Sequence, residues 1–486
     1  MREAALELLN RTMEEQLKRS EHPSDFPALP PIPAGRYTDP RFEALEKERL
    51  WNRTWLLAGI ASDLPAPGSY RLFQHLDRSV ILSHGKDGRI RAFHNACRHR
   101  GSPLLLEPQG RAMRFICPYH AWGYDLEGTL KSVPSQHDFA CLDKAENGLI
   151  EVKCDTYRGF IFINFDDDAE PLQNFLGEFV ALTEGYPLEC MVVKDHFFVE
   201  MACNWKIAYH NFLEIYHVNT VHPTTLAPHL DSRSFVIALY EGGHMRFGTR
   251  KKGGESLFKT PPVKPDDIAP VFLENTVALP TFPNTFFSLD PVGFNLQCFW
   301  PMGSDRSVME VRQMGWATDS EEDKLYWQGM RTATEHILSE DLCLFENIQQ
   351  SLRNGTIPSI WAGYQERALY WFEEEIDRRI GPDHVPTDLR VQPRIASFMA
   401  PRSGCRRGSS ERNAPRRIFT SIRSGDARLN SRRRRRMRWP GLAVSRKPLA
   451  PRTSCQWLNR PSISAVVTGS WAGSASGASP AAIRRS

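Results

Sequence analysis

Short stretches of alternating apolar and polar residues occur between positions 69 and 166, and they predict antiparallel strands. Alternation with a period of two is typical of strands that bury one face. Turn residues such as Lys86, Asp87 and Gly88 separate these stretches. We expect strands at 69–76, 78–85, 88–95, 114–125 and 159–166. Residues 45–165 are therefore predicted to form a small all-β domain.

Beyond residue 166 the pattern changes to longer segments, in which helical periodicity alternates with strand-like runs. We expect helices at 176–182, 205–216, 321–338 and 341–353. We expect strands at 196–204, 234–242, 285–302 and 307–317. A sheet faced by helices buries the apolar sides of both. The prediction for residues 166–395 is an α+β domain.

The two ends of the chain follow neither pattern. Residues 1–22 are predicted to form an amphipathic helix and residues 23–36 a proline-rich linker without regular structure, so that residues 1–44 precede the first domain. Residues 396–486 are rich in Arg, Ser, Gly, Ala and Pro and lack hydrophobic periodicity, which predicts disorder. Two interpretations of this tail are open: a segment that binds nucleic acid or another anionic surface, or non-native sequence translated out of frame.

Charge is distributed unevenly between this tail and the rest of the chain. Residues 401–486 hold 19 Arg and one Lys against one Glu and one Asp, which gives them a net charge of +18. Since the whole chain carries +4, residues 1–400 carry −14. A basic interface for nucleic acid is therefore not expected on the folded part.

Length and composition narrow the class of protein further. At 486 residues the chain is too long for one hydrophobic core, which predicts at least two domains. It has no run of about 18 apolar residues that could span a membrane, and no apolar block near its start that resembles a secretory signal. We therefore expect a cytoplasmic protein without a membrane partner. Ten cysteines over this length are too few for a disulfide scaffold.

Two of the cysteines each have a histidine within three residues. Cys97 and His99 form a Cys-x-His pair, and after 17 intervening residues Cys117 and His120 form a Cys-x-x-His pair. Two thiolates and two imidazoles suit either tetrahedral zinc or an iron–sulfur cluster. In a Rieske centre two Cys hold one iron and two His hold the other, and here each motif supplies one of each. The pattern favours a [2Fe–2S] cluster over structural zinc.

A second candidate metal site lies downstream, where residues 204–222 read NWKIAYHNFLEIYHVNTVH. His217 and His222, with a carboxylate from elsewhere, would form the 2-His-1-carboxylate face that leaves positions on Fe(II) open for oxygen and substrate. Five steps along an ideal helix leave two side chains about 140° apart. The helix must therefore end or distort between the two histidines.

The segments NACRHRG and CPYHAW, taken with residues 204–222, resemble the catalytic alpha subunits of Rieske non-haem iron oxygenases, the aromatic ring-hydroxylating family. The resemblance implies an N-terminal all-β Rieske domain followed by a helix-grip-like catalytic domain built on an antiparallel sheet. It implies that the ligands of the [2Fe–2S] cluster are Cys97, His99, Cys117 and His120. It also implies that the ligands of the mononuclear Fe(II) are His217, His222 and Asp341.

Two acids gain a role only through this resemblance. In the family, a carboxylate at the position of Glu214 links a cluster histidine of one subunit to an iron histidine of the next. Many members carry Asp there, and Glu is familiar in members that act on quaternary amines. Glu214 precedes His217 by three residues, which places both on one face of the predicted helix. Without the resemblance, Glu214 would be a solvated helix acid and Asp341 a charge complement near a helix start.

The combined expectation is an oxygenase alpha subunit. It would receive electrons from a ferredoxin and/or flavin reductase, which takes them from NAD(P)H. It would use O2 to hydroxylate a small organic substrate, and an aromatic substrate is the first expectation. The resemblance implies a homotrimer or an α3β3 assembly. Two alternatives stay open: a Rieske monooxygenase or demethylase acting on a quaternary amine or methoxy compound, and an electron-transfer Rieske protein without oxygenase activity.

Overall fold

Short strands dominate the first domain of the computed structural model, which describes residues 3–252, 266–318 and 320–400. Their bounds are β2 Leu56–Ile60, β3 Ser69–Phe73, β4 Val80–His84, β5 Ile90–His94, β6 Gln109–Arg111, β7 Phe115–Ile116, β8 Gly123–Tyr124, β9 Leu130–Ser132, β10 Glu151–Tyr157 and β11 Phe160–Asn164. A seven-stranded sheet has the order β2-β11-β10-β5-β4-β3-β6, and β7-β8-β9 form a three-stranded sheet. The prediction of an all-β first domain is confirmed.

Local sequence explains how this domain presents its loops. Strands β4 and β5 pair with Val80 opposite His94, and the turn between them contains Gly88 at φ +80°, a conformation that glycine adopts without strain. Strand β5 then leads into the loop that carries Cys97, while β7 and β8 form the hairpin that carries Cys117. Beneath both loops lies a small hydrophobic core of its own.

The second domain is built on one antiparallel sheet of seven strands. Its strands are β12 Met191–Met201, β13 Leu230–Leu239, β14 Met245–Lys251, β15 Asn275–Thr281, β16 Thr285–Leu289, β17 Phe294–Pro301 and β18 Ser307–Trp316. They lie in the order β12-β18-β17-β16-β15-β14-β13. The predicted antiparallel sheet is confirmed, although β14 and β15 were not among the predicted strands.

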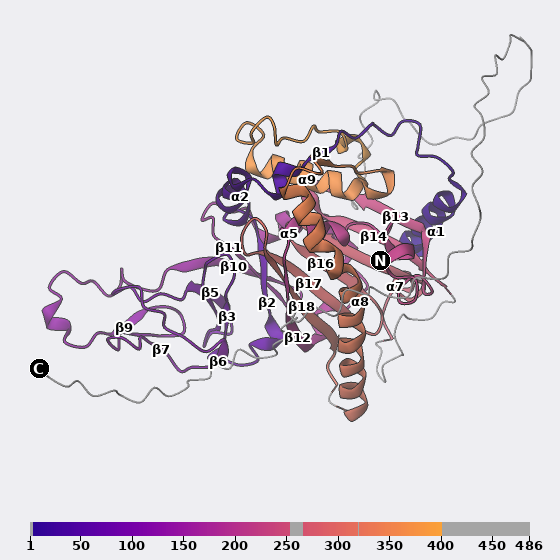
Figure 1. Cartoon of the computed structure of the whole chain (residues 1–486). Coiled ribbons are helices and arrows are strands. Elements are labelled where there is room, and N and C mark those ends of the chain that lie inside the picture. Colours follow the sequence, from indigo (N-terminus) through magenta and orange to yellow (C-terminus); the bar gives the residue numbers. More distant parts are fainter. Residues whose placement is uncertain (1–2, 253–265, 319, 401–486) are drawn as a thin grey trace, which may run out of the picture. The chain divides into compact units, whose positions relative to one another are not determined.

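Helix α8 (Glu321–Arg353) runs along this sheet as a single element of 33 residues (Figure 1). The hydroxyl of Ser320 caps its first turn by accepting a hydrogen bond from the Asp323 amide at 3.1 Å. A buried stripe follows at helical spacing: Trp327, Met330, Thr334, Leu338, Asp341, Phe345, Gln349 and Leu352. The prediction of two helices, separated at residues 339–340, was therefore wrong, because the apolar stripe continues through that point.

Further helices complete the second domain. They are α3 Leu172–Leu176, α4 Glu178–Leu182, α5 Trp205–Asn211, α6 Val218–Val221, α7 Pro270–Glu274 and α9 Arg367–Ile380. Gly177, at φ +46°, separates α3 from α4. Of the predicted helix at 176–182, residues 178–182 form α4, whereas Leu176 ends α3, a helix that the sequence analysis did not predict.

The segment before the first domain is more ordered than its composition indicates. Helix α1 (Glu3–Lys18) buries Leu9 and Met13, which confirms the predicted amphipathic helix. The proline-rich stretch was expected to lack regular structure, yet β1 (Ile32–Pro33) pairs with β19 (Ser359–Ile360). Proline tolerates this position because the strand at which it lies has only one partner.

The C-terminal end of the described chain also packs against the body. Residues 396–398 form a 3-10 turn, and the Ala400 amide donates a hydrogen bond of 2.8 Å to the carbonyl of Leu239. The prediction of a disordered tail beginning at residue 396 is therefore wrong for residues 396–400, and the rest of it falls outside the described residues. Among the described helices, none is long and apolar enough to cross a membrane.

Candidate metal centres

The two Cys-containing loops share one backbone design. The Cys97 amide donates to the carbonyl of Ser102, and the Cys97 carbonyl accepts from the amide of Gly101, both at 2.8 Å. Cys117 repeats this arrangement with Trp122 at 2.8 Å and Ala121 at 3.0 Å. The residue four positions after each cysteine has a positive φ, +75° at Gly101 and +56° at Ala121. Two tight turns of the same form therefore present the two motifs.

Hydrogen bonds to sulfur characterise the surroundings of the two thiols. The Arg98 amide donates to the hydroxyl of Tyr124 at 3.0 Å, which leaves that hydroxyl to donate to Sγ of Cys97 at 3.4 Å. At Cys117 burial raises the thiol pKa, but backbone amides of Tyr119 and His120 outweigh burial and lower it. These donors suit a metal-bound thiolate. Tyr124 was missed in the sequence, because nothing local marks its contact with Cys97.

The two histidines of the loops lie next to each other. The rings of His99 and His120 are 4.8 Å apart, and His99 stacks on Trp122 at 4.9 Å. A single zinc would draw all four ligand atoms to one point. Among the described residues, the group of His, Cys, Asp or Glu side chains that converges as on a single metal ion consists of His217, His222 and Asp341, outside these loops. The paired thiols and paired imidazoles therefore fit a two-iron cluster better than zinc.

Helix α5 ends earlier than the sequence indicated. It stops at Asn211, and residues 212–217 form a turn before the four-residue α6. Oε2 of Glu214 accepts hydrogen bonds from the backbone amides of Tyr216 and His217, and Oε1 accepts from Nδ1 of His217. The prediction that Glu214 and His217 share a helical face was wrong. Their contact exists nevertheless, because the carboxylate binds the backbone of the turn.

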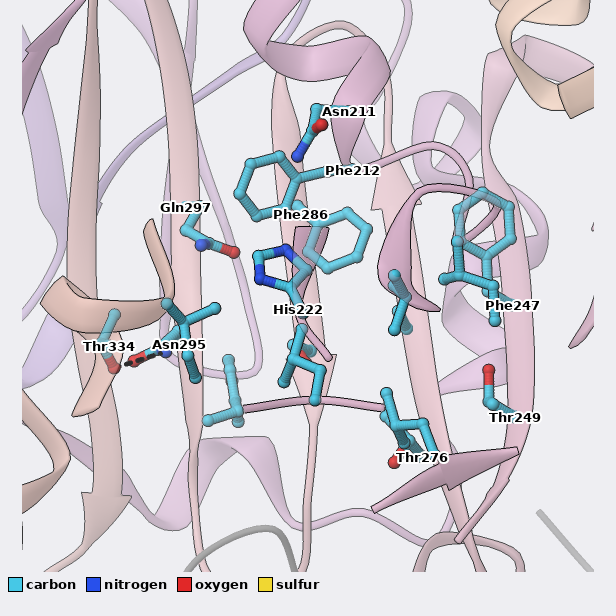
Figure 2. A pocket seen from close by; sticks show the side chains of 18 of the residues that line it. Asn211, Phe212, His222, Phe247, Thr249, Thr276, Phe286, Asn295, Gln297 and Thr334 are labelled. Atoms are coloured by element: carbon cyan, nitrogen blue, oxygen red, sulfur yellow. Dashed lines mark hydrogen bonds between the residues drawn. The ribbon is translucent and has the colours of Figure 1, made fainter. Parts of the chain in front are cut away.

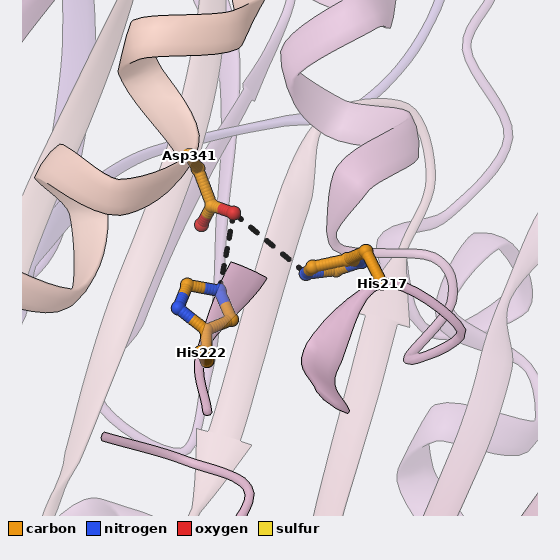
Figure 3. A group of neighbouring side chains, drawn as sticks. All are labelled: His217, His222 and Asp341. Carbon is orange, nitrogen blue, oxygen red and sulfur yellow. Dashed lines mark ion pairs between the residues drawn. The ribbon is translucent and has the colours of Figure 1, made fainter. Parts of the chain in front are cut away.

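His217 and His222 occupy the two ends of α6 and both face helix α8 (Figure 3). Oδ1 of Asp341 lies 3.7 Å from Nε2 of His217 and 3.1 Å from Nε2 of His222. The three ligand atoms all lie within 4.8 Å of one another. The expectation that the helix must end between the two histidines is met by this short α6.

The carboxylate at this point has unused binding capacity. Oδ1 of Asp341 is buried and has no hydrogen-bond partner, although Nε2 of His222 is only 3.1 Å away. A buried carboxylate oxygen this close to two imidazole nitrogens is the arrangement expected of ligands that share one metal ion. Burial lowers the pKa of His222, but the carboxylates of Asp341 and Glu340 outweigh it and raise that pKa. Two neutral imidazoles and one carboxylate form a ligand set with one negative charge, which fits a divalent iron.

Asp341 does not lie near a helix start, as the sequence suggested, but twenty residues into α8. It occupies a core-facing position of the buried stripe, where an acid is unusual. That position in the stripe was the sequence signal that could have supported its functional role independently. Glu340, which the sequence analysis did not select, accepts from Nδ1 of His222 at 2.7 Å.

A pocket with a cavity volume of about 200 Å³ is lined in part by these three residues (Figure 2). Its apolar lining combines five phenylalanines with eight other apolar side chains. The phenylalanines are Phe212, Phe235, Phe247, Phe286 and Phe294, and the others are Ile215, Val218, Leu226, Leu230, Ala278, Met330, Ile337 and Leu338. Polar side chains lie between them, including Asn211, Thr249, Thr276, Asn295 and Gln297. Neither Lys nor Arg occurs among the described residues that line it. The pocket offers space for a small organic molecule next to the candidate iron ligands.

The candidate cluster site and the candidate iron site with its pocket thus lie in separate domains, which is the organisation expected of an oxygenase with two iron centres. Two family models match the chain: the Rieske [2Fe-2S] domain over residues 54–146, and the ring hydroxylating alpha subunit (catalytic domain) over residues 188–382. The chain belongs to the Rieske non-haem iron oxygenases, as a catalytic alpha subunit. The first domain of this family binds a [2Fe–2S] cluster and the second a mononuclear iron.

Relatives with assigned activities fall into two substrate groups. The chain is 33% identical over 195 residues to the glycine betaine monooxygenase oxygenase subunit of Pseudomonas aeruginosa. This alignment covers 40% of this chain and 45% of that protein. It is 28% identical to the carnitine monooxygenase oxygenase subunit of Acinetobacter pittii, over 68% of this chain and 89% of that protein. It is 35% identical to the benzene 1,2-dioxygenase subunit alpha of Pseudomonas putida, over 42% of this chain and 48% of that protein.

Solved structures show the same fold. A quaternary ammonium Rieske monooxygenase superimposes with a TM-score of 0.64 and 23% identity, over 74% of this chain and 99% of that one. Naphthalene 1,2-dioxygenase from Rhodococcus sp. gives a TM-score of 0.61 and 19% identity, over 78% of this chain and 98% of that one. The expected fold, a Rieske domain followed by an antiparallel-sheet catalytic domain, is confirmed.

Proposed function

We propose that this subunit hydroxylates a small, largely apolar organic substrate with O2, using electrons from a separate reductase. The observation that carries the proposal is the largely apolar pocket, with five phenylalanines in its lining, that opens directly onto His217, His222 and Asp341. When bound, the two iron groups supply one-electron transfer and oxygen activation. The protein contributes the ligands, the orientation of the substrate and the exclusion of water.

The roles of the site residues follow from their contacts. Cys97, Cys117 and the paired histidines of the two loops would hold the cluster, and His217, His222 and Asp341 would hold the mononuclear iron. Glu214 hydrogen bonds Nδ1 of His217, which fixes the proton on that nitrogen and leaves Nε2 free for the metal. Its other oxygen is used by the turn, so the carboxylate is held on both sides.

Pocket composition supports an aromatic or otherwise apolar substrate. Faces and edges of phenylalanine rings pack well against flat rings, and such contacts contribute about 0.5–1.5 kcal/mol beyond area burial. A substrate carboxylate would find no Lys or Arg among the described lining residues. Burying an unpaired charge is costly, so zwitterionic substrates with a free carboxylate are disfavoured at this site.

A second candidate is monooxygenation of a quaternary amine. Glu214 stands where many family members have Asp, and Glu at this position is familiar in members that act on such amines. Phenylalanine rings also attract cations through their faces. Relatives named for glycine betaine and carnitine support this candidate, and the relative named for benzene supports the first.

We further propose a trimeric assembly that receives its electrons from a ferredoxin and/or a flavin reductase supplied with NAD(P)H. In such a ring, Glu214 would join the cluster of one subunit to the iron of the next. One solved relative is described in terms of inter-subunit electron transfer, which supports this arrangement. Mass photometry of the purified protein would measure the oligomeric state.

Oxygen uptake coupled to a reductase and NADH would test the function with a matched panel of compounds. Benzene, naphthalene and indole represent one class, and carnitine, glycine betaine and choline the other. We expect turnover and ring-hydroxylated products with the neutral aromatics, whereas release of formaldehyde or an aldehyde from the amines would favour the second candidate.

The control for this assay is Asp341→Ala, which should keep the cluster absorption and lose both mononuclear iron and turnover. Unchanged turnover in Asp341→Ala would show that another carboxylate completes the site. Oxygen uptake that no compound of either class increases would contradict the proposed function.

A further inference from the structure

The imidazole of His222 lies between two acids that are consecutive in the sequence. Oδ1 of Asp341 is 3.1 Å from Nε2 at one edge of the ring, and Oε2 of Glu340 is 2.7 Å from Nδ1 at the other edge. Because an ionised carboxylate can only accept, Nδ1 carries the proton and donates it to Glu340. Nε2 then keeps its lone pair on the side of Asp341 and His217.

We infer that Glu340 is a positioning residue for the mononuclear iron site, since it fixes the tautomer and the ring plane of His222. It does not itself face the shared centre, because its oxygen is used at Nδ1. The inference rests on the iron site of the proposed function. An anionic partner at Nδ1 also makes Nε2 a stronger metal ligand.

A second contact holds Glu340 in place. The hydroxyl of Thr225 donates to the same Oε2 at 2.6 Å, so this oxygen accepts from two side chains of the loop after α6. Hydrogen bonds to an ionised carboxylate are roughly twice as strong as neutral ones. Helix α8 is thereby tied to the loop that carries His222, and the ring cannot rotate without breaking a charge-assisted bond.

Side-chain length explains why Glu and Asp occur in this order. Consecutive residues on a helix point about 100° apart, so only one of the two can face the shared centre directly. Asp341, 6% exposed, is the shorter and lies at the centre, whereas Glu340, 19% exposed, has the additional methylene that reaches around the ring. A shorter acid at position 340 would leave Nδ1 of the buried His222 without its partner.

Metal binding by the purified full-length protein tests this inference without relying on turnover. Mononuclear iron would be removed with a mild chelator, and the affinity for added Fe(II) measured while the visible absorption of the cluster is monitored. Cobalt(II) in the same site provides a ligand-field spectrum that reports coordination geometry. Outer-shell partners of metal-bound histidines typically contribute about 10- to 100-fold in affinity.

We expect Glu340→Ala to weaken Fe(II) binding by about 10- to 100-fold and to shift the cobalt spectrum, with the cluster absorption unchanged. Glu340→Gln keeps a hydrogen-bond acceptor, so its affinity for Fe(II) should lie between those of Glu340→Ala and the wild type. Thr225→Val should also weaken Fe(II) binding, but by a smaller factor. Thr225→Ser keeps the hydroxyl and should bind Fe(II) with wild-type affinity. The matched control is Glu322→Gln, an exposed acid in the first turn of the same helix.

Wild-type affinity and an unchanged cobalt spectrum in Glu340→Ala would overturn the inference. So would iron retained in Asp341→Asn but lost in Glu340→Gln, because Glu340 would then be the ligand. If Glu340→Ala fails to fold, the Thr225→Val and Thr225→Ser pair decides, and equal affinities for the two would overturn it. A wild-type protein that binds no mononuclear iron would instead overturn the proposed function.

Discussion

At the scale of single residues, the Rieske loops depend on side chains that have no substitute nearby. Cys97 is buried and already accepts a hydrogen bond from Tyr124. Its replacement by Ala removes one of only two thiols in the paired loops, and no other described cysteine belongs to this core. The cluster should therefore not assemble.

We predict that purified Cys97→Ala lacks the brown colour and visible absorption of the wild type. The control is Cys141→Ala, which removes an exposed cysteine from the same domain and should retain full absorption. A colourless wild-type protein that contains zinc would contradict the assignment of the cluster.

Spacing along the chain was enough to select most of the candidate site residues, because paired Cys and His within one turn leave few other interpretations. It could not select Glu340, Thr225 or Tyr124, whose contacts join segments far apart in the sequence. Nor could it show that Ala121 adopts a positive φ, since a non-glycine residue in that conformation is uncommon.

At the scale of elements, the fold was predicted well where periodicity is strong and poorly where side chains compete with the backbone. The stretch 205–216 has helical periodicity, but the helix ends at Asn211. Beyond this point the Glu214 carboxylate, and not a helical carbonyl, accepts from the amides of Tyr216 and His217. Similarly, pairing of β1 with β19 joins residues more than 300 positions apart. No local pattern reports such a partner.

The segment after β1 is held by an ion pair inside the protein. Arg36 is buried between Glu373 and Asp377 of α9, with contacts of 2.6 Å to each. Removing the guanidinium would take away the cation that directly contacts both buried carboxylates.

We predict that Arg36→Ala lowers the free energy of unfolding by about 3–5 kcal/mol, as measured by urea denaturation. Arg41→Ala serves as the control, because Arg41 pairs with Asp39 at the surface and such pairs contribute about 1 kcal/mol or less. Equal losses in the two variants would contradict a buried network.

Between β13 and β14, His244 connects two backbone segments through both ring nitrogens. Nε2 donates to the carbonyl of Phe175 at 2.7 Å, and Nδ1 accepts from the amide of Phe282 at 3.3 Å. This use of both nitrogens requires the neutral ring. Burial, together with the nearby Arg379, lowers the pKa of His244 to about 4, against an opposing contribution from the Phe175 carbonyl.

We predict that the protein loses stability as the pH falls from about 6.5 to about 4. In this range His244 is protonated in the unfolded chain but stays neutral in the folded chain. This difference lowers the free energy of unfolding by about 3 kcal/mol. Thermal midpoints measured across this pH range should fall less steeply in His244→Gln. The control His137→Gln, at an exposed position, should keep the wild-type slope.

At the scale of the whole molecule, the order of the two domains was predictable because each carries its own motif. The arginine-rich end contributes +18 to the charge and no recognisable motif. The last described residue, Ala400, donates a backbone hydrogen bond to Leu239 of β13. The sheet of the catalytic domain is therefore complete before the arginine-rich segment begins.

We predict that a chain ending at Ala400 keeps the cluster absorption, the iron content and the oligomeric state of the full-length protein. Its net charge would change from +4 to −14, which should abolish any binding to heparin or nucleic acid shown by the full chain. Absorption spectroscopy would measure the cluster, metal analysis the iron content and mass photometry the oligomeric state. A loss of colour or assembly on truncation would contradict the prediction.

One rigid helix, about 50 Å long, supplies both one wall of the pocket and the acids beside the histidines. A substitution at Thr334 or Leu338 lies only one or two turns from Asp341, so it changes cavity shape and metal geometry together. Residues of the opposite wall, such as Phe247 and Thr276, belong to strands that contribute nothing to the ligand set. New substrate preferences should therefore arise, in natural selection or in the laboratory, through the strands, while the helix remains under much stronger constraint.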